Sequence, residues 1–340
     1  MPHFNLAFLG FGHVGKALAE LLLRKSEDIH QENGVTWKVT GIATGSHGMA
    51  INPSGLNLQQ ALACANAGEP LSSLSSAPII DTLDFIRQCG ADVLFEMLPV
   101  NYESGQPAIH YIQTALEMGM HVATANKGPV VHAYHELTNL ARSRGVRFYF
   151  ESAVMDGAPV FGLFRETLPA ARILGFRGVL NSTTNLILSR MEDGESYKEA
   201  LQYAQSIGIA ETDPSGDVDG WDAAIKVAAL TTVLMGVPIK PQDVDRKGIR
   251  GISVEDVAQA KAEGKRWKLV CEARWVGNQL QATVAPQKVG VDSPLYGVEG
   301  TSSIVQIESD VLGKLSLIEE DPSPHTTAYG LLADFLNAVR

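Results

Sequence analysis

Cysteine is scarce in this chain of 340 residues. The three cysteines, Cys64, Cys89 and Cys271, lie far apart without CxxC spacing, which excludes a disulfide framework and gives no indication of a zinc site. The sequence also lacks a secretory signal at its start and an apolar run long enough to span a membrane. We therefore expect a cytoplasmic protein with reduced cysteines and no membrane partner.

Positive charge is limited too. There are 27 Lys and Arg residues against 38 Asp and Glu, for a formal net charge of −11. This balance argues against a nucleic-acid partner, because binding to a phosphate backbone depends on clustered cations, but it does not exclude a small anionic ligand in a local pocket. With 45% hydrophobic residues, no internal repeats and no low-complexity tracts, the composition suits two domains with a large core.

A glycine-rich turn opens the first predicted domain. The apolar run at residues 4–9 leads into GFGHVG at residues 10–15, and a helical pattern follows directly. In this G-x-G-x-x-G pattern, Gly10, Gly12 and Gly15 allow a tight turn, a close approach of a pyrophosphate to the backbone, and close packing of helix on strand. The order of strand, turn and helix favours dinucleotide binding over a plain structural turn.

The residues after the second predicted strand leave the choice of cofactor open. Residues 37–44 form that strand, and Thr44 is followed by Gly45, Ser46 and His47. An NAD site often has an acidic residue here for the ribose hydroxyls, and an NADP site has a nearby cation for the 2′-phosphate. Neither is present, so NADP is permitted but not required, and we predict NADP or NAD as the cofactor.

Two kinds of sheet are predicted. Buried strands such as residues 91–98 are each followed by a helix, which predicts an α/β fold with a Rossmann-type doubly wound parallel sheet in residues 1–150, interrupted by an insertion at 48–78. Residues 151–325 instead contain alternating strands of an antiparallel or mixed sheet and form a second, α+β domain. We expect the C-terminal helix, residues 326–340, to pack back on the first domain.

Three polar positions each admit two interpretations. Lys127 ends a predicted strand, where ligands bind in doubly wound folds, but it also suits a solvated loop. Glu151 closes an aromatic strand, residues 146–154, and either caps the following turn or joins neighbouring carbonyls in binding a hard cation. The polar stretch 181–185 is either a hydroxyl-rich helix cap or a source of hydroxyls for a polar substrate.

An acidic stretch, residues 208–226, is the most distinctive part of the chain. It places five carboxylates ahead of a lysine: Glu211, Asp213, Asp217, Asp219 and Asp222, then Lys226. From Trp221 the pattern predicts a largely buried helix whose first turn is capped by Asp219. Asp222 and Lys226 are four residues apart and share one face, where the acidic loop can fold over them. A surface ion pair is the plainer interpretation, but a lysine among carboxylates on a buried helix suits a proton donor beside a reacting oxygen.

With these motifs placed, the chain resembles homoserine dehydrogenase over nearly its whole length. The matching stretches, in order, are GFGHVG at 10–15, TANKGP at 124–129, ESAVMDGAP at 151–159, GVLNSTTN at 178–185 and AETDPSGDVDGWDAAIK at 210–226. The last stretch is the most specific, since glycine turns are common and this acidic block is not. The resemblance implies NAD(P)-dependent interconversion of L-homoserine and L-aspartate 4-semialdehyde, in threonine, methionine and isoleucine biosynthesis.

The resemblance also implies residue roles. Lys226 would donate and accept the proton at the substrate oxygen, with Asp222 as its catalytic neighbour. Substrate binding is implied for Glu211, Asp217, Asp222, Ser182 and Thr183, and Lys127 would lie between substrate and cofactor. Besides the glycines and Thr44, cofactor contacts are implied for Phe11, His13, Val14 and Gly208. A sodium site is implied at Glu151 with the backbone carbonyls of Val154, Asp156 and Ala158.

Two departures from the family pattern affect these expectations. Many relatives have a G-x-G-A-G turn before the last helix, whereas this chain reads IEEDPSPHTTAYG at 318–330, and its acidic residues cannot approach a phosphate as bare glycine backbone does. The sequence also ends at Arg340 without the regulatory module of longer members. We therefore expect a homodimer whose second domain serves both catalysis and dimerisation, without threonine feedback through such a module.

Two other functions are compatible with the residues. One is a related NAD(P)-dependent reductase of another small aldehyde or keto acid, and the other is a catalytically silent protein that senses a dinucleotide. The set of Glu211, Asp222 and Lys226 disfavours the sensor, because a sensor has no need of a buried group of acids and lysine.

Overall fold

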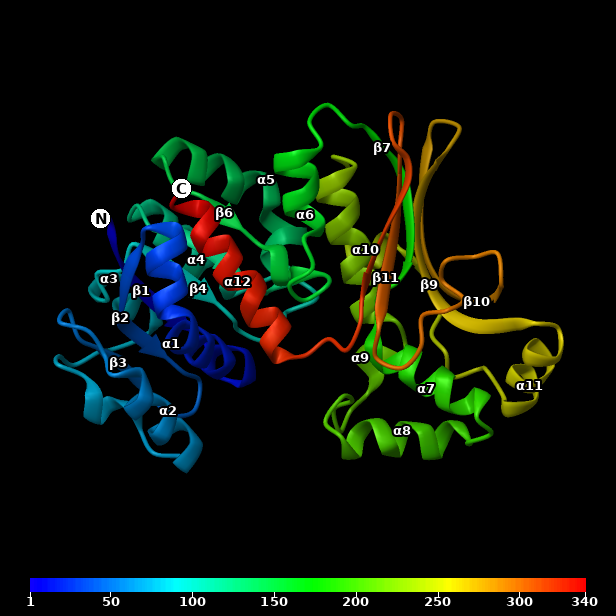
Figure 1. Cartoon of the computed structure of the whole chain (residues 1–340), viewed down its shortest axis with the longest axis horizontal. Helices are drawn as coiled ribbons and strands as arrows, with labels where there is room; N and C mark the ends of the chain where they lie inside the picture. Colours follow the sequence, from blue (N-terminus) through cyan, green and yellow to red (C-terminus); the bar gives the residue numbers. More distant parts are fainter. The chain divides into compact units, whose positions relative to one another are not determined.

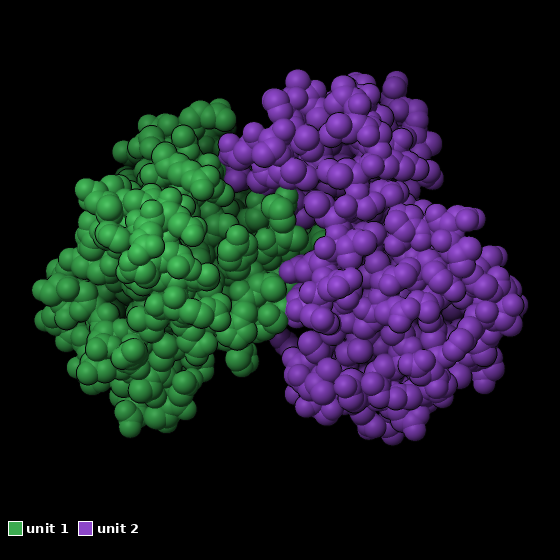
Figure 2. All heavy atoms as spheres, in the orientation of Figure 1, with its two compact units in different colours: residues 1–159, 323–340 green, residues 160–322 purple.

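The computed structural model describes all 340 residues, which fold into two units (Figure 1, Figure 2). Unit 1 comprises Met1–Pro159 and Ser323–Arg340, and unit 2 comprises Val160–Pro322. The first boundary thus follows Pro159 rather than residue 150, and the chain returns to unit 1 at Ser323 rather than at residue 326. None of the helices is both long enough and apolar enough to cross a bilayer.

The sheet of unit 1 confirms the predicted doubly wound fold. Its six strands are ordered β3-β2-β1-β4-β5-β6, and each neighbouring pair is parallel except β2 and β3. The antiparallel edge strand β3 comes from the predicted insertion. The strands are β1 His3–Leu9, β2 Thr36–Ala43, β3 Met49–Ile51, β4 Val93–Glu96, β5 His121–Thr124 and β6 Phe148–Tyr149.

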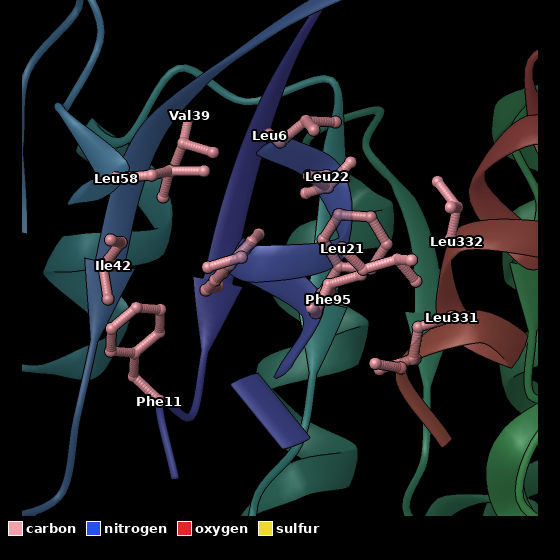
Figure 3. Packing of buried hydrophobic residues seen from close by; sticks show 14 of the residues in the cluster. Leu6, Phe11, Leu21, Leu22, Val39, Ile42, Leu58, Phe95, Leu331 and Leu332 are labelled. Carbon is pink, nitrogen blue, oxygen red and sulfur yellow. The ribbon is translucent and has the colours of Figure 1, made fainter. Parts of the chain in front are cut away.

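Helices α1 and α12 pack side by side against this sheet. Figure 3 shows Leu331 and Leu332 of α12 in one cluster with Leu22 of α1 and Phe95 of β4. Because these apolar side chains are removed from water together, the C-terminal helix is held in unit 1. The helices of unit 1 are α1 His13–Asn33, α2 Leu58–Ala67, η1 Leu71–Leu74, α3 Thr82–Gln88, α4 Ala108–Glu117, α5 Lys127–Arg144, η2 Glu151–Ala153 and α12 Pro324–Ala338.

The predicted strand at residues 146–154 is much shorter than expected. Only β6, Phe148–Tyr149, pairs with the sheet, and the chain then turns into η2. The backbone N–H of Glu151 donates to Asp334 of α12 at 2.8 Å, and the hydroxyl of Ser152 donates to the Thr327 carbonyl at 2.7 Å. The backbone N–H of Glu151 is thus satisfied by α12 rather than by a sheet neighbour, through a residue 183 positions away that the local pattern could not indicate.

The sheet of unit 2 confirms the predicted mixed sheet. Its order is β12-β11-β7-β9-β10-β8, with β8 parallel to β10 and the other pairs antiparallel. The strands are β7 Ile173–Val179, β8 Asp245–Arg246, β9 Lys265–Val276, β10 Gln279–Gly290, β11 Ser303–Ser309 and β12 Gly313–Glu319. The helices are α6 Val160–Gly162, the π-helical turn η3 Leu163–Thr167, α7 Ser182–Glu192, α8 Tyr197–Ser206, α9 Ser215–Val218, α10 Trp221–Leu234, η4 Pro241–Asp243 and α11 Val254–Ala262.

Candidate active site

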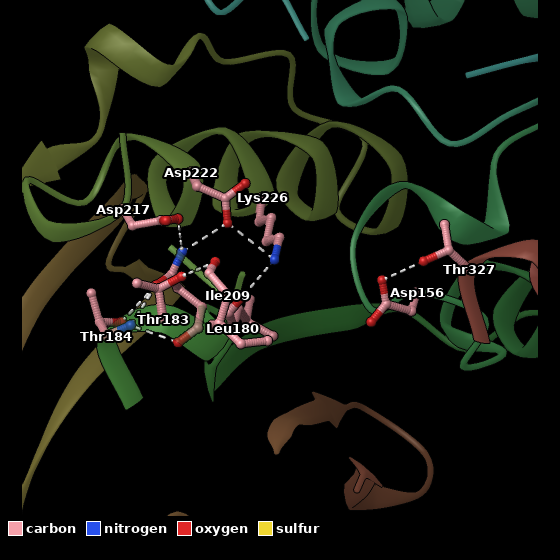
Figure 4. A network of polar contacts seen from close by, with 10 residues as sticks. Asp156, Leu180, Thr183, Thr184, Ile209, Asp217, Asp222, Lys226 and Thr327 are labelled. Carbon is pink, nitrogen blue, oxygen red and sulfur yellow. Dashed lines mark hydrogen bonds and ion pairs between the residues drawn. The ribbon is translucent and has the colours of Figure 1, made fainter. Parts of the chain in front are cut away.

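The first turns of α10 bring a lysine and a carboxylate together in unit 2. Lys226 Nζ lies 3.1 Å from Asp222 Oδ2 and donates to the Leu180 carbonyl at 2.6 Å (Figure 4). The two side chains are only 14% and 13% exposed, and the helix beyond them is buried at residues 227–232. The predicted shared face of Asp222 and Lys226 is therefore confirmed. An ion pair enclosed in this way is less screened than one on the surface.

Asn181 links this pair to a second carboxylate. It follows the end of β7 and caps α7, with its Oδ1 accepting from the Thr184 backbone N–H at 2.9 Å. Its Nδ2 donates to Asp217 Oδ1 at 2.7 Å and to Asp222 Oδ2 at 3.0 Å. Lys226, Asp222, Asn181 and Asp217 thus form one continuous polar chain built from α10, α7 and α9.

The pKa of Asp217, the carboxylate at the far end of this chain from Lys226, is raised. Burial raises its pKa, and the neighbouring carboxylate of Asp222 raises it further, whereas the hydrogen bond from Asn181, the nearby hydroxyl of Thr183 and the charge of Lys226 lower it. A carboxylate in this setting is stabilised in its charged form by any additional cation, such as an ammonium group.

The first turn of α7 carries the predicted hydroxyls. Ser182 is half-buried as the first residue of the helix, and Thr183 is buried. The hydroxyl of Thr183 donates to the Ile209 carbonyl at 3.2 Å, which ties α7 to the loop before α9. The helix cap predicted within residues 181–185 is present, with the amide of Asn181 as the capping group, and the substrate role of the hydroxyls stays a prediction.

Two of the five predicted carboxylates, Asp222 and Asp217, are linked to Lys226, the first directly and the second through Asn181. Glu211 and Asp213 are exposed, and Asp213 accepts from the Ser215 backbone N–H at 3.0 Å. The amide of Gln205 on α8 donates to the backbone carbonyl of Glu211 at 3.0 Å, so the position of this residue is fixed through its main chain. The substrate contact predicted for Glu211 stays a prediction.

The prediction that Asp219 caps α10 is also wrong. The N-cap is Gly220, at φ +81°, and no side chain caps the helix. The carboxylate of Asp219 instead pairs with Arg250, and its carbonyl accepts from Arg246, whose guanidinium lies 3.7 Å from the centre of the Trp221 ring. These arginines follow Asp219 by 27 and 31 residues, so the local pattern could not indicate them.

The glycine turn between β1 and α1 has the shape that a dinucleotide requires. Gly10 has φ +106°, and a Cβ there would lie 2.6 Å from the Met97 carbonyl oxygen, while a Cβ at Gly15 would lie 2.6 Å from the Gly10 oxygen. A Cβ on Gly12 would meet nothing within 4 Å, and α1 begins without a side-chain cap. Open space beside Gly12 and N–H groups in the uncapped first turn fit a bound pyrophosphate.

The remaining cofactor candidates differ in what they expose. Phe11 is buried, with its ring centre 5.9 Å from that of Phe8, so only its backbone is available to a ligand. His13 is exposed and Val14 half-buried at the start of α1. Gly208 belongs to unit 2, in the turn after α8, where its φ of +76° is one that glycine adopts without strain.

The loop after β2 is closed by Thr44. Its hydroxyl donates to the Gly48 carbonyl at 2.9 Å and accepts from the His47 backbone N–H at 2.7 Å. A neighbouring pocket is lined by uncharged residues only: Gly48, Met49, Ser72, Ser75, Ser76, Ala77, Pro78 and Ile79. Neither the loop nor the pocket contains a lysine or arginine.

Lys127 is the first residue of α5, not the end of a strand. Asn126 caps the helix by accepting from the Gly128 N–H at 2.9 Å, and its amide donates to Glu96 at 3.2 Å. Glu96 is fully buried at the end of β4 and also accepts from the hydroxyl of Thr124 on β5; burial raises its pKa. Glu96 thus fixes the strand ends that precede Lys127. Sequence reasoning missed it, although an acid inside the apolar run ADVLFEML was a visible signal.

The predicted cation segment is an irregular loop packed on α12. Glu151 is buried, and Asp156 has φ +43° and accepts from the hydroxyl of Thr327 at 2.8 Å (Figure 4). The carbonyls of Val154, Asp156 and Ala158 belong to the same loop. No group of three or more His, Cys, Asp and Glu side chains in the chain is arranged to hold a metal ion, so a cation here would depend on backbone carbonyls.

Comparison with known families agrees with this geometry. Residues 159–336 match the model described as homoserine dehydrogenase, and residues 10–151 match the model of the homoserine dehydrogenase NAD-binding domain. The chain belongs to the homoserine dehydrogenase family. The predicted resemblance is confirmed over both units.

Individual relatives in the family cover the whole chain. The NAD(+)-dependent homoserine dehydrogenase of Pseudomonas canavaninivorans is 35% identical over 99% of this chain and 96% of its own length. The homoserine dehydrogenase of Methanocaldococcus jannaschii is 35% identical over 98% of both chains. A crystal structure of a putative homoserine dehydrogenase from Archaeoglobus fulgidus superposes with a TM-score of 0.87, at 32% identity and 98% coverage of both chains.

Proposed function

We propose that this protein interconverts L-homoserine and L-aspartate 4-semialdehyde with a nicotinamide dinucleotide. The observation that carries the proposal is the enclosed ammonium of Lys226, held 3.1 Å from Asp222 and 2.6 Å from the Leu180 carbonyl, in a chain of the homoserine dehydrogenase family. A family match alone does not supply a proton donor, whereas this arrangement does.

Lys226 handles the proton of the reaction. In the reductive direction, the electron pair of the aldehyde C=O bond moves to oxygen as hydride adds to carbon, and the Lys226 ammonium donates the proton that completes the hydroxyl. In the oxidative direction, neutral Lys226 takes the hydroxyl proton as the C–H bond gives up hydride. When bound, the dinucleotide supplies or accepts that hydride. Asp222 keeps the ammonium oriented and favours its charged form.

The charged ends of the substrate have partners of opposite sign. The substrate ammonium suits Asp217, because burial and Asp222 raise the pKa of this carboxyl and an added cation would favour its charged form. Glu211, on the loop that Gln205 anchors, is the second candidate for this contact. The substrate carboxylate suits hydrogen-bond donors and cations, of which Ser182, Thr183 and Lys127 are the candidates. These assignments fit an amino-acid aldehyde better than a simple aldehyde, which has no ammonium group for Asp217 and Glu211 to bind.

The dinucleotide we propose is NAD in preference to NADP. The 2′-phosphate of NADP requires a cation near the end of β2, but residues 44–48 and the adjoining serine-lined pocket contain neither lysine nor arginine. The relative from Pseudomonas canavaninivorans, described as NAD(+)-dependent, supports this choice. Assays run in parallel with the two dinucleotides would contradict it if NADP gave the higher kcat/KM.

A monovalent cation such as sodium is the proposed ligand of the loop at residues 151–158. A buried carboxylate at Glu151 beside irregular backbone supplies the oxygen ligands that hard cations take. Activity measured in sodium chloride against choline chloride at equal ionic strength checks this assignment.

A homodimer is the proposed assembly, formed through one face of the mixed sheet of unit 2. Along β7, β9, β11 and β12 this face alternates in charge, with Arg177, Glu272, Arg274, Glu308 and Lys314 lining a shallow depression. A surface that carries both signs can complement itself across a two-fold axis. Light scattering should give a molar mass of twice that of one chain. In Arg274→Glu the measured mass should fall toward that of a single chain.

Absorbance of reduced nicotinamide tests the reaction. Incubation with L-homoserine and oxidised dinucleotide should produce reduced cofactor, whereas L-serine and simple primary alcohols should give at most about one-hundredth of that kcat/KM, because they misplace the hydroxyl or lack the charged ends. Equal rates with a simple alcohol would favour a different reductase. Dinucleotide binding without turnover of any alcohol would favour a sensor.

A further inference from the structure

Asn181 occupies a junction that neither the family match nor the proton chemistry assigns to it. It is 4% exposed, and its side chain meets three helices: it caps α7 and donates to a carboxylate on α9 and to another on α10. Its orientation is unambiguous, because the Thr184 backbone N–H can only donate and therefore faces the amide oxygen of Asn181. The two protons of Nδ2 must then point toward Asp217 and Asp222.

The two carboxylates at this junction oppose each other. The charge of Asp222 makes it harder to ionise Asp217, and Lys226 forms its ion pair with Asp222. Two neighbouring carboxylates without compensation tend to share one proton, as like charges close together cannot both ionise easily. A shared proton would leave either the substrate ammonium or Lys226 with a neutral partner.

Asn181 donates to both carboxylates through one amide nitrogen. Of the groups around Asp217, α10 contributes Asp222 and Lys226, and α7 contributes only uncharged donors. The thiol of Cys271 on β9 lies near Lys226 and Asp222, but burial raises its pKa to about 12, so it carries no charge at neutral pH. One amide with two N–H groups therefore covers both acids without adding a charge that would compete with the substrate.

We propose that Asn181 is a positioning residue that keeps Asp217 and Asp222 both charged and separately assigned, Asp217 to the substrate ammonium and Asp222 to Lys226. This role rests on the proposed function, because it assigns the amino group of homoserine to Asp217. It also explains why the capping residue of α7 is asparagine: serine, threonine or aspartate would cap the helix equally well, but none of them offers two N–H donors.

The test uses variants that preserve the cap. Asn181→Ser and Asn181→Asp both retain an oxygen for the Thr184 N–H, but the first removes the shared donor and the second replaces it with a third carboxyl group. We expect Asn181→Ser to raise the KM for homoserine about tenfold to a hundredfold, the usual effect of losing hydrogen bonds to charged groups, without changing the KM for dinucleotide. The acidic limb of kcat/KM for reduction of L-aspartate 4-semialdehyde, in which Lys226 stays protonated, should move to higher pH in Asn181→Ser and further still in Asn181→Asp.

Thr184→Val is the matched control. It removes the hydroxyl that donates to Asn181 but leaves the backbone cap and both carboxylate contacts in place, so it should reduce thermal stability without moving the pH profile. If Asn181 were only a cap, its serine variant would keep the KM for homoserine and the acidic limb of the unaltered protein. That outcome would overturn the proposal.

A measurement on the unaltered protein covers the case in which both Asn181 variants fail to fold. If both acids are charged at neutral pH, kcat/KM for reduction of L-aspartate 4-semialdehyde, the direction in which Lys226 must be protonated, should be flat there on the acidic side. A shared proton would place the acidic limb at or above neutrality and contradict the role of Asn181. Failure of the unaltered protein to oxidise homoserine at any pH would contradict the proposed function itself, and so the two failures are distinguishable.

Discussion

Lys226 and Asp222 form an ion pair of 3.1 Å on one face of α10, and each side chain is about seven-eighths enclosed, with 14% and 13% exposed. The ammonium also donates a hydrogen bond to the carbonyl of Leu180, the residue that follows β7. An ammonium group held from two sides has few orientations left, so it can meet a reacting oxygen without first reorganising. This is the physical basis for treating Lys226 as the proton donor and acceptor.

Replacement of Lys226 by alanine should therefore remove most of the turnover. We expect kcat to fall by about a hundredfold or more, because the developing alkoxide loses both its proton donor and a positive charge, while the protein stays folded and binds dinucleotide. Lys226→Arg should be nearly as inactive, since a guanidinium keeps the charge but does not release its proton in this pH range. Lys198→Ala, at an exposed lysine of α8, is the control, and near-normal turnover of Lys226→Ala would remove this mechanism.

Gln205 should affect substrate binding through the backbone of the acidic loop. Its amide donates to the carbonyls of Glu211 and Thr212 at 3.0 and 3.3 Å. In Gln205→Leu the loop loses both bonds, and we expect the KM for homoserine to rise about threefold to tenfold with little change in kcat, as for the loss of one or two neutral hydrogen bonds. Gln202→Leu, at an exposed position of the same helix, should have no such effect. Equal kinetic changes in the two variants would show that Gln205 has no special role.

Local patterns in the sequence were sufficient to predict the elements that carry their own signal. The spacing of Asp222 and Lys226 on an uncharged helix predicted a shared, enclosed face, and the structure confirms it. The glycine pattern at residues 10–15 predicted the turn between β1 and α1, where a Cβ on Gly15 would lie 2.6 Å from the Gly10 oxygen and a Cβ on Gly10 would lie 2.6 Å from the oxygen of Met97, just past β4. Both predictions depend on interactions along a single element or between adjacent ones.

Contacts between distant segments were beyond such patterns. In the sequence, Asn181 has the properties of an ordinary helix cap. Its second role depends on Asp217 and Asp222, which follow it by 36 and 41 residues and meet it only where α7, α9 and α10 come together. Asp219 was predicted as a cap because capping is its commonest role before a helix, but Arg250 competes for its carboxylate with a full charge. In each case the deciding partner is supplied by tertiary structure.

Burial of Lys268 on β9 should make the free energy of unfolding depend on pH. Its side chain is 1% exposed and donates to Asn185 and to the Val298 carbonyl, and burial lowers its pKa from 10.5 to about 8. Between these two pH values the unfolded chain binds more protons than the folded one, so this group makes the free energy of unfolding rise with pH from about 8 to 10.5.

Lys268→Met isolates that contribution. The unfolding free energy of the unaltered protein minus that of Lys268→Met should increase as the pH is raised through this window, in denaturant titrations at several pH values. Lys265→Met, at a lysine of the same strand whose side chain is 47% exposed, should show no comparable trend. Parallel pH curves for the unaltered protein and Lys268→Met would mean that the buried amine does not titrate in this range.

Two glycines of the turn between β1 and α1 should respond in opposite ways to alanine. In Gly12→Ala the new methyl group meets no protein atom within 4 Å, and the backbone there has φ −79°, so the thermal midpoint should be unchanged. The same methyl group occupies the space in which the pyrophosphate would approach the backbone, and we expect dinucleotide to bind about tenfold more weakly or worse.

Gly10→Ala should instead destabilise the fold by about 2 kcal/mol or more, because φ is +106° and the Cβ would lie 2.6 Å from the Met97 oxygen. Calorimetric titration with NAD and thermal melts of both variants check the pair. Full dinucleotide affinity in a stable Gly12→Ala would mean that the pyrophosphate does not lie at this turn.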